Sequence, residues 1–392
     1  MRIAWFSDAP WVPSGFGSQT ALLLPLLREL GHEIAVIQTT GLTHGVAEWR
    51  GFPVFPAGNA PWNADMLPTF AGAMKADITI GFIDPWVLQP AIIKACPRFV
   101  SLYPVDHDPL PKCCIPPLTA AWDRIAYSKF GVSKTEEAGL TCHYAPHGFD
   151  GSVYYPMDKS EARAALELPD DGRFVVGVVA ANNDPLPARK SWAQIIEGFK
   201  LFYDAVGGDA LLYLHAPILG QVNIGDIIEF YGVPSEAIRV CNQGHQRIGF
   251  PPEHMRQTYN AMDVLLAPSM GEGFGLPIIE AQACNVPVIV GGWTAMPELV
   301  RFGISIDKEY ATSVLTHLIS NQWLPSIDSI SQGIEFIRNL LATDQEFNPA
   351  GKRFVQEYEI RRVVETYWQP ILSRFQARIV AEELAEKVEA IK

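Results

Sequence analysis

The 392-residue sequence predicts an α/β protein with two doubly wound domains, each a parallel sheet covered by helices. Two observations support this prediction. Short apolar runs, typical of buried strands, alternate with helical segments along most of the chain. The polar segment 157–172 interrupts this alternation, which starts again after it. We therefore expect a first domain at 1–158 and a second at 159–369.

The first half of the chain opens with a strand, a helix and a second strand. Residues 2–6 form a short apolar run, residues 19–30 have a helical pattern that ends at Gly31, and residues 32–38 form another apolar run. Two strands joined by a helix are predicted to pair in parallel. Further strands are expected at 76–84, 98–106 and 124–128, with a helix from Lys129.

The second half repeats the alternation. Expected strands lie at 173–180, 210–216, 263–268 and 286–292, and expected helices at 191–206, 224–233 and 255–262. The tail, 353–392, is helical and charged, and we expect its helix 370–392 to pack on the first domain. Ligands bind doubly wound sheets at the carboxyl ends of the strands. We therefore expect the ligand site in a cleft between the two domains.

Composition narrows the class of protein. The chain is 48% hydrophobic and 19% charged, which allows a large core. Its net charge of −13 argues against a broadly basic nucleic-acid-binding module, although it leaves room for a local basic groove. The six cysteines contain no Cys-x-x-Cys pair and are interpreted as free thiols in a reducing cytoplasm. No apolar run reaches the roughly 18 residues of a membrane-spanning helix, so we expect a cytoplasmic protein without a membrane span.

The first glycine loop is SGFGSQT, residues 14–20. It reads Gly-x-Gly-x-x-Thr, and the second strand ends without Asp or Glu, which argues against a nicotinamide or flavin site. Two glycines ahead of a helix still allow backbone N–H groups to face an anion. Gly15 and Gly17 are therefore candidate donor-binding residues, and the alternative is a plain connecting loop.

The second glycine loop follows the expected strand 263–268. Glu272 and Glu280 are separated by seven residues, and glycines between them allow close approach of a ligand to the backbone. Pro277 suits the first turn of a helix whose N-terminus can face a phosphate. Carboxylates that accept hydroxyl groups, beside amides that bind phosphate, predict a sugar nucleotide as ligand. For Glu280 alone, the alternative is a carboxylate that only stabilises the first helical turn.

The segment GEGFGLPIIEAQACNVPVI, at 271–289, resembles the Glu-x7-Glu signature of retaining glycosyltransferases of family 4, which have the two-domain GT-B fold. The resemblance covers most of the chain. The opening 1–37, the segments YSKFGVSKTEEAGL and HYAPHGFDGSVYYP, and VVGVVAANNDPLPARKSW are also similar to that family. It implies two Rossmann-like domains, the first on the acceptor side and the second binding the nucleotide sugar.

The resemblance also implies roles for individual residues. Glu280 would bind the donor ribose and Glu272 would lie against the donor sugar. Arg189 and Lys190 would stabilise the charge that develops on the departing β-phosphate without a metal. Backbone amides would contact the sugar and diphosphate at Gly273, Phe274, Gly275 and Leu276. Relatives often carry Arg or Lys where this chain has AANN at 180–183, which puts one phosphate contact in doubt.

The segment YPVDHDP, residues 103–109, contains Asp106, His107 and Asp108. An Asp-x-Asp pattern after a strand binds a metal in another glycosyltransferase fold, but that fold has one sheet domain and leaves the second half unexplained. The resemblance implies that His107 contacts the 6-hydroxyl of the sugar and that Asp106 holds the acceptor. The alternative is a capped turn.

Two further regions complete the set of candidates. The resemblance places His215 and the loop 242–249 near the nucleotide base. The His147-Gly148 pair and the turn Asp84-Pro85-Trp86 are interpreted as structural.

The sequence thus predicts a retaining, metal-independent glycosyltransferase that moves a hexosyl or pentosyl group from a nucleoside diphosphate sugar, needing no cofactor. The acceptor hydroxyl could belong to a carbohydrate, a lipid-linked molecule or a hydroxymethylated pyrimidine in DNA. A sugar-nucleotide-binding protein without turnover is the alternative from another class. The sequence leaves the nucleotide base, the sugar, the acceptor and the oligomeric state open.

Overall fold

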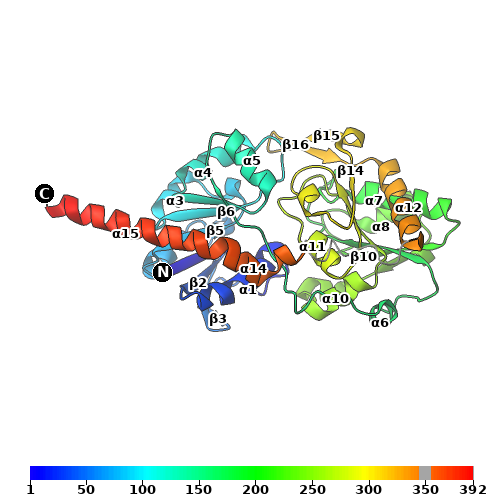
Figure 1. Cartoon of the computed structure of the whole chain (residues 1–392), viewed down its shortest axis with the longest axis horizontal. Coiled ribbons are helices and arrows are strands. Elements are labelled where there is room, and N and C mark those ends of the chain that lie inside the picture. The colour runs from blue at the N-terminus through cyan, green and yellow to red at the C-terminus, as the bar shows by residue number, and fades with distance from the viewer. Residues whose placement is uncertain (344–354, 392) are drawn as a thin grey trace. The chain divides into compact units, whose positions relative to one another are not determined.

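The computed structural model describes residues 1–343 and 355–391, which form two compact units (Figure 1). Unit 1 comprises 1–105, 110–148 and 359–392, and unit 2 comprises 106–109 and 149–358. The boundaries expected at 158 and 369 lie somewhat C-terminal to the points where the chain passes between units. Residues 353, 354 and 392 of the expected helical tail lie outside the described residues. Among the described residues, no helix is both long and apolar enough to span a membrane.

Unit 1 is built on an eight-stranded sheet in the order β3-β4-β2-β1-β5-β6-β7-β8. All neighbours are parallel except β3 and β4. The strands are β1 Arg2–Ser7, β2 Glu33–Gln38, β3 Ala47–Trp49, β4 Phe52–Phe55, β5 Ile78–Phe82, β6 Phe99–Tyr103, β7 Asp123–Ala126 and β8 His143–Tyr144. The helices are α1 Gly15–Glu29, α2 Leu67–Ala73, α3 Pro90–Ala95, α4 Ile115–Ala120, α5 Lys129–Glu137, α14 Ile360–Val363 and α15 Gln369–Ile391.

Helix α1 begins earlier than the sequence pattern predicts. The Ser14 side chain caps the helix by accepting a hydrogen bond from the Gly17 N–H at 3.0 Å, so the glycine loop forms the first helical turn. A Cβ at Gly17 would lie 2.3 Å from the Val12 carbonyl oxygen, which only a glycine avoids. The close turn between β1 and α1 therefore accounts for this glycine.

Helix α15 packs on unit 1. The Glu382 carboxylate accepts hydrogen bonds from Arg98 Nε at 3.0 Å and from Trp122 Nε1 at 2.9 Å. The Arg378 guanidinium lies 3.9 Å from the centroid of the Trp122 ring. Through these contacts helix α15 is part of unit 1, together with the N-terminal strands.

Unit 2 contains a six-stranded parallel sheet in the order β11-β10-β9-β12-β13-β14 and a separate hairpin, β15-β16. The strands are β9 Phe174–Val179, β10 Ala210–His215, β11 Ile238–Val240, β12 Val264–Ala267, β13 Val288–Gly291, β14 Gly303–Ile306, β15 Thr312–Leu315 and β16 Asn321–Leu324. The helices are α6 Lys159–Ala165, α7 Trp192–Ala205, α8 Ile224–Phe230, α9 Gln243–Ile248, α10 Pro252–Asn260, α11 Leu276–Ala283 and α12 Ile327–Thr343.

The strand order of unit 2 reverses between β9 and β12, because β10 and β11 lie on one side and β13 and β14 on the other. In open α/β sheets, ligands bind outside the carboxyl ends of the strands at such a reversal. The prediction of two doubly wound parallel sheets is confirmed, and the topology directs attention to the loops that follow β9 and β12.

One short segment departs from the expected division. Asp106–Pro109 lies in the first half of the chain, but its contacts belong to unit 2. The Asp108 N–H donates to the Asn321 carbonyl at 3.1 Å, and the Asn321 N–H donates back at 3.3 Å. The segment thus pairs with β16 and becomes part of unit 2.

Candidate active site

The loop after β12 places Glu272 between two cations that come from the loop after β9. Glu272 Oε2 accepts from Arg189 Nη1 at 3.1 Å, and Glu272 Oε1 pairs with Lys190 Nζ. Arg189 Nη1 also donates to the Gly271 carbonyl oxygen at 3.0 Å. The Glu272 side chain is 14% exposed and that of Lys190 is 15% exposed, so this pair is largely shielded from water, whereas the Arg189 side chain is 30% exposed.

In this cluster, burial and the neighbouring opposite charges shift the pKa values in opposite directions. Burial alone would raise the pKa of Glu272, but the positive charges of Lys190 and Arg189 outweigh it and hold that pKa at about 2. Burial lowers the pKa of Lys190, and Glu272 only partly opposes this effect. Burial also works against the charge of Arg189, but the charges of Glu272 and Asp106 raise its pKa above the usual value. Glu272 is therefore a carboxylate across the physiological pH range.

The glycines around Glu272 have a steric explanation in the structure. A Cβ at Gly271 would lie 2.2 Å from the Asp106 carbonyl oxygen, so the loop approaches the Asp106–Pro109 segment closely. Gly275 has φ +112°, in the region that favours glycine, and caps the N-terminus of α11. Phe274 is buried and packs edge-on against Tyr358, with ring centroids 5.8 Å apart. The loop that includes Gly273 and leads to Leu276 is thus anchored at both ends.

A hollow lies beside this cluster at the carboxyl ends of β9 and β12, where the strand order reverses. The hollow is small and partly open to solvent. Polar groups enter it from Lys190, Ser269 and Glu272, and the start of α11 forms another wall. The rest of the lining is apolar and comes mainly from the ends of β9 and β12, with residues Val178, Val179, Ala180, Ile195, Leu266, Ala267, Gly275, Pro277 and Ile278.

The second glutamate has a different environment. Glu280 lies on α11, and its Oε2 accepts a hydrogen bond from the Tyr259 hydroxyl at 2.6 Å. The Tyr154 hydroxyl also hydrogen-bonds to this carboxylate. Burial raises the pKa of Glu280, and the two tyrosines reduce the increase without cancelling it. Nothing local in the sequence marks either tyrosine as a partner of Glu280, because Tyr259 lies on the largely polar helix α10 and Tyr154 in a connecting segment after β8.

Asp106 and His107 stand close to the ion-pair cluster. His107 Nδ1 lies 2.6 Å from Asp106 Oδ1, and His107 Nε2 lies 2.9 Å from the Thr316 hydroxyl oxygen. Burial would raise the pKa of Asp106, but the hydrogen bond from His107 and the charges of His107 and Arg189 lower it overall.

Among the described residues, no group of three or more His, Cys, Asp or Glu side chains is placed to hold a metal ion.

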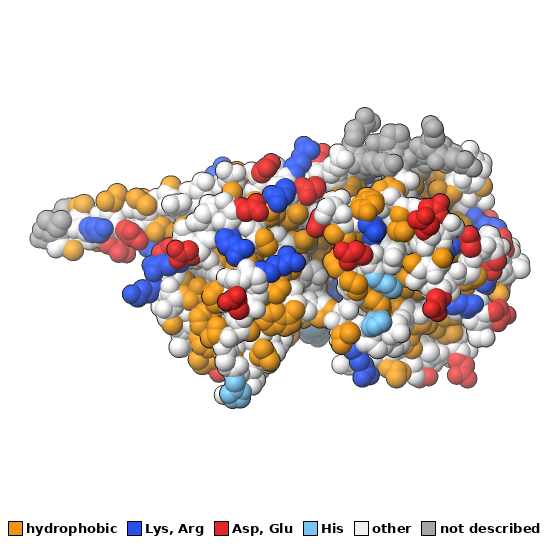
Figure 2. Space-filling model, turned by 90° about the horizontal axis from the view of Figure 1, so that it is seen from below, with side chains coloured by type: hydrophobic (Ala, Val, Ile, Leu, Met, Phe, Trp, Pro, Cys, Tyr) orange, Lys and Arg blue, Asp and Glu red, His pale blue; other side chains and the backbone are white. Residues whose placement is uncertain are grey.

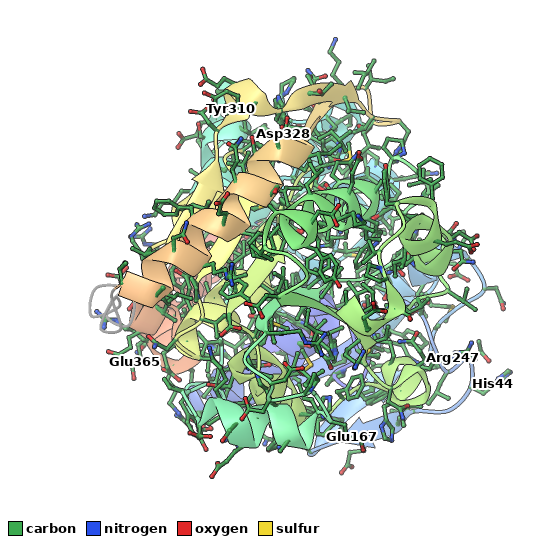
Figure 3. The ribbon with its side chains drawn as sticks, turned by 90° about the vertical axis from the view of Figure 1, so that its right-hand side faces the viewer. His44, Glu167, Arg247, Tyr310, Asp328 and Glu365 are labelled. Atoms are coloured by element: carbon green, nitrogen blue, oxygen red, sulfur yellow. The ribbon has the colours of Figure 1, made fainter. Side chains whose placement is uncertain are left out.

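His215 lies at the carboxyl end of β10, away from the ion-pair cluster. Burial, and the charge of His254 to a smaller degree, lower the pKa of His215 to about 4. Its Nδ1 atom is buried without a hydrogen-bond partner. Its ring lies 4.7 Å from that of Phe250, which stacks on His254 at 4.3 Å. The neighbouring helix α9 carries Arg247 at the surface of unit 2 (Figure 3).

The segment AANN after β9 has a structural role at Asn182. This side chain is buried, and its Nδ2 donates to the Pro217 and Val222 carbonyl oxygens at 3.0 and 2.7 Å. Asn182 therefore fastens the loop after β10, and Arg189 and Lys190 provide the cations on the β9 loop.

The structure brings most of the sequence-predicted site residues together within unit 2. Arg189, Lys190, Glu272 and Asp106 form one electrostatic cluster, with Glu280 further along α11. Gly15 and Gly17 lie in unit 1, where the Gly17 N–H already donates to Ser14.

Comparison with known proteins agrees with this architecture. The family model "Glycosyl transferases group 1" matches residues 229–318. A D-inositol 3-phosphate glycosyltransferase from Mycobacterium tuberculosis (strain ATCC 25618 / H37Rv) is 31% identical over 185 residues. That match covers 47% of this chain and 34% of the relative, so the chain spans about a third of the length of that curated relative.

Solved structures match over nearly the whole chain. A glycosyltransferase from Rickettsia africae ESF-5 has a TM-score of 0.68 at 14% identity, covering 97% of this chain and 98% of that one. Anabaena Alr3699/HepE in complex with UDP-glucose has a TM-score of 0.68 at 16% identity, covering 95% and 100%. Sucrose-phosphate synthase from Thermosynechococcus elongatus has a TM-score of 0.63 at 16% identity and full coverage of both chains. The chain therefore has the GT-B glycosyltransferase fold, with two Rossmann-like domains.

Proposed function

We propose that this protein is a retaining, metal-independent glycosyltransferase of family 4. It would transfer a hexosyl or pentosyl group from a nucleoside diphosphate sugar to a hydroxyl acceptor. One observation carries the proposal: Glu272, Arg189 and Lys190 form a shielded ion-pair cluster beside a hollow at the carboxyl ends of β9 and β12. The resemblance of 271–289 to the Glu-x7-Glu signature supports the same role.

The two cations would supply the charge that the reaction needs. When the bond from the anomeric carbon to the β-phosphate oxygen breaks, negative charge develops on the diphosphate. Arg189 and Lys190 are held in place by Glu272, so they need little rearrangement to stabilise that charge. The backbone amides of 273–276 would add neutral donors. This arrangement is why we propose a mechanism that requires neither a metal ion nor another cofactor.

The remaining steps need no enzymic nucleophile. The acceptor oxygen would attack the anomeric carbon from the face that the diphosphate leaves, and its proton would pass to the departing phosphate oxygen. Glu272 would lie against the sugar, and its carboxylate would favour the positive character that the anomeric carbon gains in the transition state.

The nucleoside would occupy the other part of the site. We assign Glu280 to the ribose hydroxyl groups, since two tyrosines fix its carboxylate and a carboxylate has further acceptor positions. We assign the nucleotide base to the ring cluster of His215, Phe250 and His254, whose aromatic rings lie side by side after the carboxyl end of β10.

The roles near the acceptor follow from the contacts of His107. Both of its ring nitrogens already have partners in Asp106 and Thr316, so we propose that His107 positions Asp106 and does not contact the sugar directly. Asp106 would then hold the acceptor hydroxyl group. None of the six cysteines, which all lie in the described part of the chain, forms a disulfide bond, and this supports our proposal of a reducing, cytoplasmic location.

The proposal is tested by measuring release of nucleoside diphosphate from a panel of UDP-, GDP- and ADP-sugars. At least one donor should bind and release its diphosphate slowly in water and faster with an acceptor. The Lys190→Ala variant should lose this activity, whereas Glu335→Gln, on the exposed side of α12, should keep it. A protein that binds no sugar nucleotide would refute the proposal, and one that binds donors without any release would be a binding protein.

A further inference from the structure

Three tryptophans of unit 1 expose their side chains, which is unusual for so large an apolar residue. Trp11 is 43% exposed, and Trp62 and Trp86 are each 41% exposed. Each lies on a loop that follows a strand of the same parallel sheet: Trp11 follows β1, Trp62 follows β4 and Trp86 follows β5. All three loops therefore leave the carboxyl edge of that sheet.

The topology places these loops close to one another. Strands β1 and β5 are neighbours, and only β2 separates β1 from β4. At about 4.8 Å between adjacent strands, the ends of β4 and β5 lie roughly 15 Å apart along the edge, with β1 between them. The strand order of unit 1 reverses between β1 and β5, which is where such sheets bind ligands.

Trp62 is held in an unusual backbone conformation. Its φ and ψ are 59° and 24°, in the left-handed region that bulky residues rarely adopt. The next residue fixes the loop, since buried Asn63 donates from Nδ2 to the Gln38 carbonyl oxygen at 2.8 Å and accepts from the Gly58 N–H at 2.5 Å. A loop built in this way displays the indole ring at the surface and restricts its movement.

Other exposed apolar side chains extend the same surface. In the described part of unit 1, the large exposed hydrophobic residues lie either on this edge or on helix α15. On the edge, Leu42 and Val46 join the three tryptophans from the loop after β2. Figure 2 shows hydrophobic side chains gathered on the part of its face that belongs to unit 1.

The charges on these loops restrict the partner. Residues 8–14, 39–46, 56–66 and 83–89 contain three aspartates and no Lys or Arg. A nucleic acid or an anionic membrane surface bound on these four loops would require basic residues there, and the exposed Lys112 and Lys129 follow β6 and β7 instead. The aspartates suit hydroxyl donors instead. Asp8, for example, accepts hydrogen bonds from the Ser14 and Thr39 hydroxyl groups at 2.6 Å each and retains further acceptor positions.

We propose that the carboxyl edge of the unit 1 sheet is an acceptor site for a neutral carbohydrate, with Trp11, Trp62 and Trp86 as the stacking surfaces. Sugar rings present apolar C–H faces, which pack on indole rings, and hydroxyl groups, which donate to carboxylates. The span from β4 to β5 accommodates several sugar rings in a row. This inference rests on the proposed function only in calling the bound carbohydrate an acceptor, because binding itself requires no donor.

The experiment measures binding without donor. Maltopentaose, cellopentaose and mannopentaose are titrated into the full chain by calorimetry, alongside single-stranded DNA containing hydroxymethylcytosine and phosphatidylglycerol vesicles. At least one oligosaccharide should bind. Trp62→Ala and Trp86→Ala should weaken its binding by about tenfold. Trp62→Phe should retain part of the affinity, and Leu384→Ala, an exposed residue of α15, should retain all of it.

The outcomes separate this inference from the proposed function. If no oligosaccharide binds at about millimolar concentration, or if only the DNA or the vesicles bind, the inference is wrong. It is also wrong if both alanine variants bind the oligosaccharide as tightly as the wild-type protein. Failure to bind any sugar nucleotide in a parallel titration would refute the proposed function and leave the carbohydrate site standing.

Discussion

The two sheets of this protein share a topology and differ in what their loops carry. Each reverses its strand order near the middle, between β1 and β5 in unit 1 and between β9 and β12 in unit 2. The unit 2 loops bring a shielded cluster of two cations and a carboxylate to that position. The corresponding unit 1 loops bring exposed indole rings and aspartates, without Lys or Arg. The fold thus determines where a ligand binds, and the loop residues determine which chemistry it must have.

The largest expected effect concerns the cations of unit 2. Lys190→Ala should reduce kcat/KM for the donor by about 2–4 kcal/mol of transition-state stabilisation, because one preorganised charge is lost. Steady-state release of nucleoside diphosphate measures this. Lys200→Ala, on the neighbouring helix α7, is the matched control and should behave as the wild type. Unchanged kinetics in Lys190→Ala would show that the diphosphate binds elsewhere.

The two glutamates should separate binding from turnover. Glu280→Ala should weaken binding of the bare nucleoside diphosphate by about 1.5–3 kcal/mol, because a charged acceptor for ribose hydroxyl groups is removed. Glu272→Ala should mainly lose kcat, because Glu272 acts on the sugar in the transition state and orients Arg189 and Lys190, and it should weaken binding of the bare nucleotide less than Glu280→Ala does. Calorimetry and steady-state kinetics distinguish these effects, and the reverse pattern would exchange the two assignments.

The buried carboxylate of Glu272 should also appear in the pH dependence of stability. Its folded-state pKa of about 2 lies below the ordinary value of 4.5, so its contribution is complete above the unfolded value and is lost as the pH falls towards 2. The shift corresponds to about 3 kcal/mol at most. Denaturant titrations between these pH values should show a shallower loss of unfolding free energy in Glu272→Gln. An identical slope in both proteins would mean that the ion pairs do not stabilise the carboxylate.

A smaller effect is expected from the residue that positions Glu280. Tyr259→Phe removes the hydrogen bond at 2.6 Å and should weaken nucleoside diphosphate binding by about 1 kcal/mol while leaving kcat unchanged. Titration calorimetry measures the affinity and steady-state kinetics the turnover. A fall in kcat with unchanged affinity would place this tyrosine, and with it Glu280, near the transferring sugar.

Removal of metal ions should have the smallest effect. Donor turnover should stay nearly the same in excess chelator, since Arg189 and Lys190 provide the positive charge. Activity that disappears with the chelator and returns with Mn²⁺ or Mg²⁺ would instead identify Asp106 and Asp108 as metal ligands.

The sequence could predict the sheets and the positions of the site loops, because buried strands and glycine loops leave local patterns in the chain. It could not predict the partners that only folding brings together. Tyr259 hydrogen-bonds to Glu280 from a different helix, and Thr316 reaches His107 from a hairpin far along the chain. The segment 106–109 has the pattern of a loop in the first domain, and only its backbone pairing with Asn321 joins it to unit 2.

The exposed tryptophans of unit 1 likewise could not be recognised from the sequence. The turn Asp84-Pro85-Trp86 has an ordinary turn sequence, and nothing local indicates that Trp86 is 41% exposed. Trp11 and Trp62 lie in loops far apart in the sequence, and the strand order alone gathers them on one edge. A pattern that arises from sheet topology cannot be seen along a single chain.

The most direct test of the account is a crossed binding measurement on two variants. Calorimetry with the best-binding nucleoside diphosphate and the best-binding neutral oligosaccharide is applied to Lys190→Ala and Trp62→Ala. We predict that Lys190→Ala loses affinity for the diphosphate and keeps the oligosaccharide, and that Trp62→Ala does the opposite. If Lys190→Ala binds the diphosphate as tightly as the wild type, the loops after β9 and β12 do not form the donor site and the central claim is wrong.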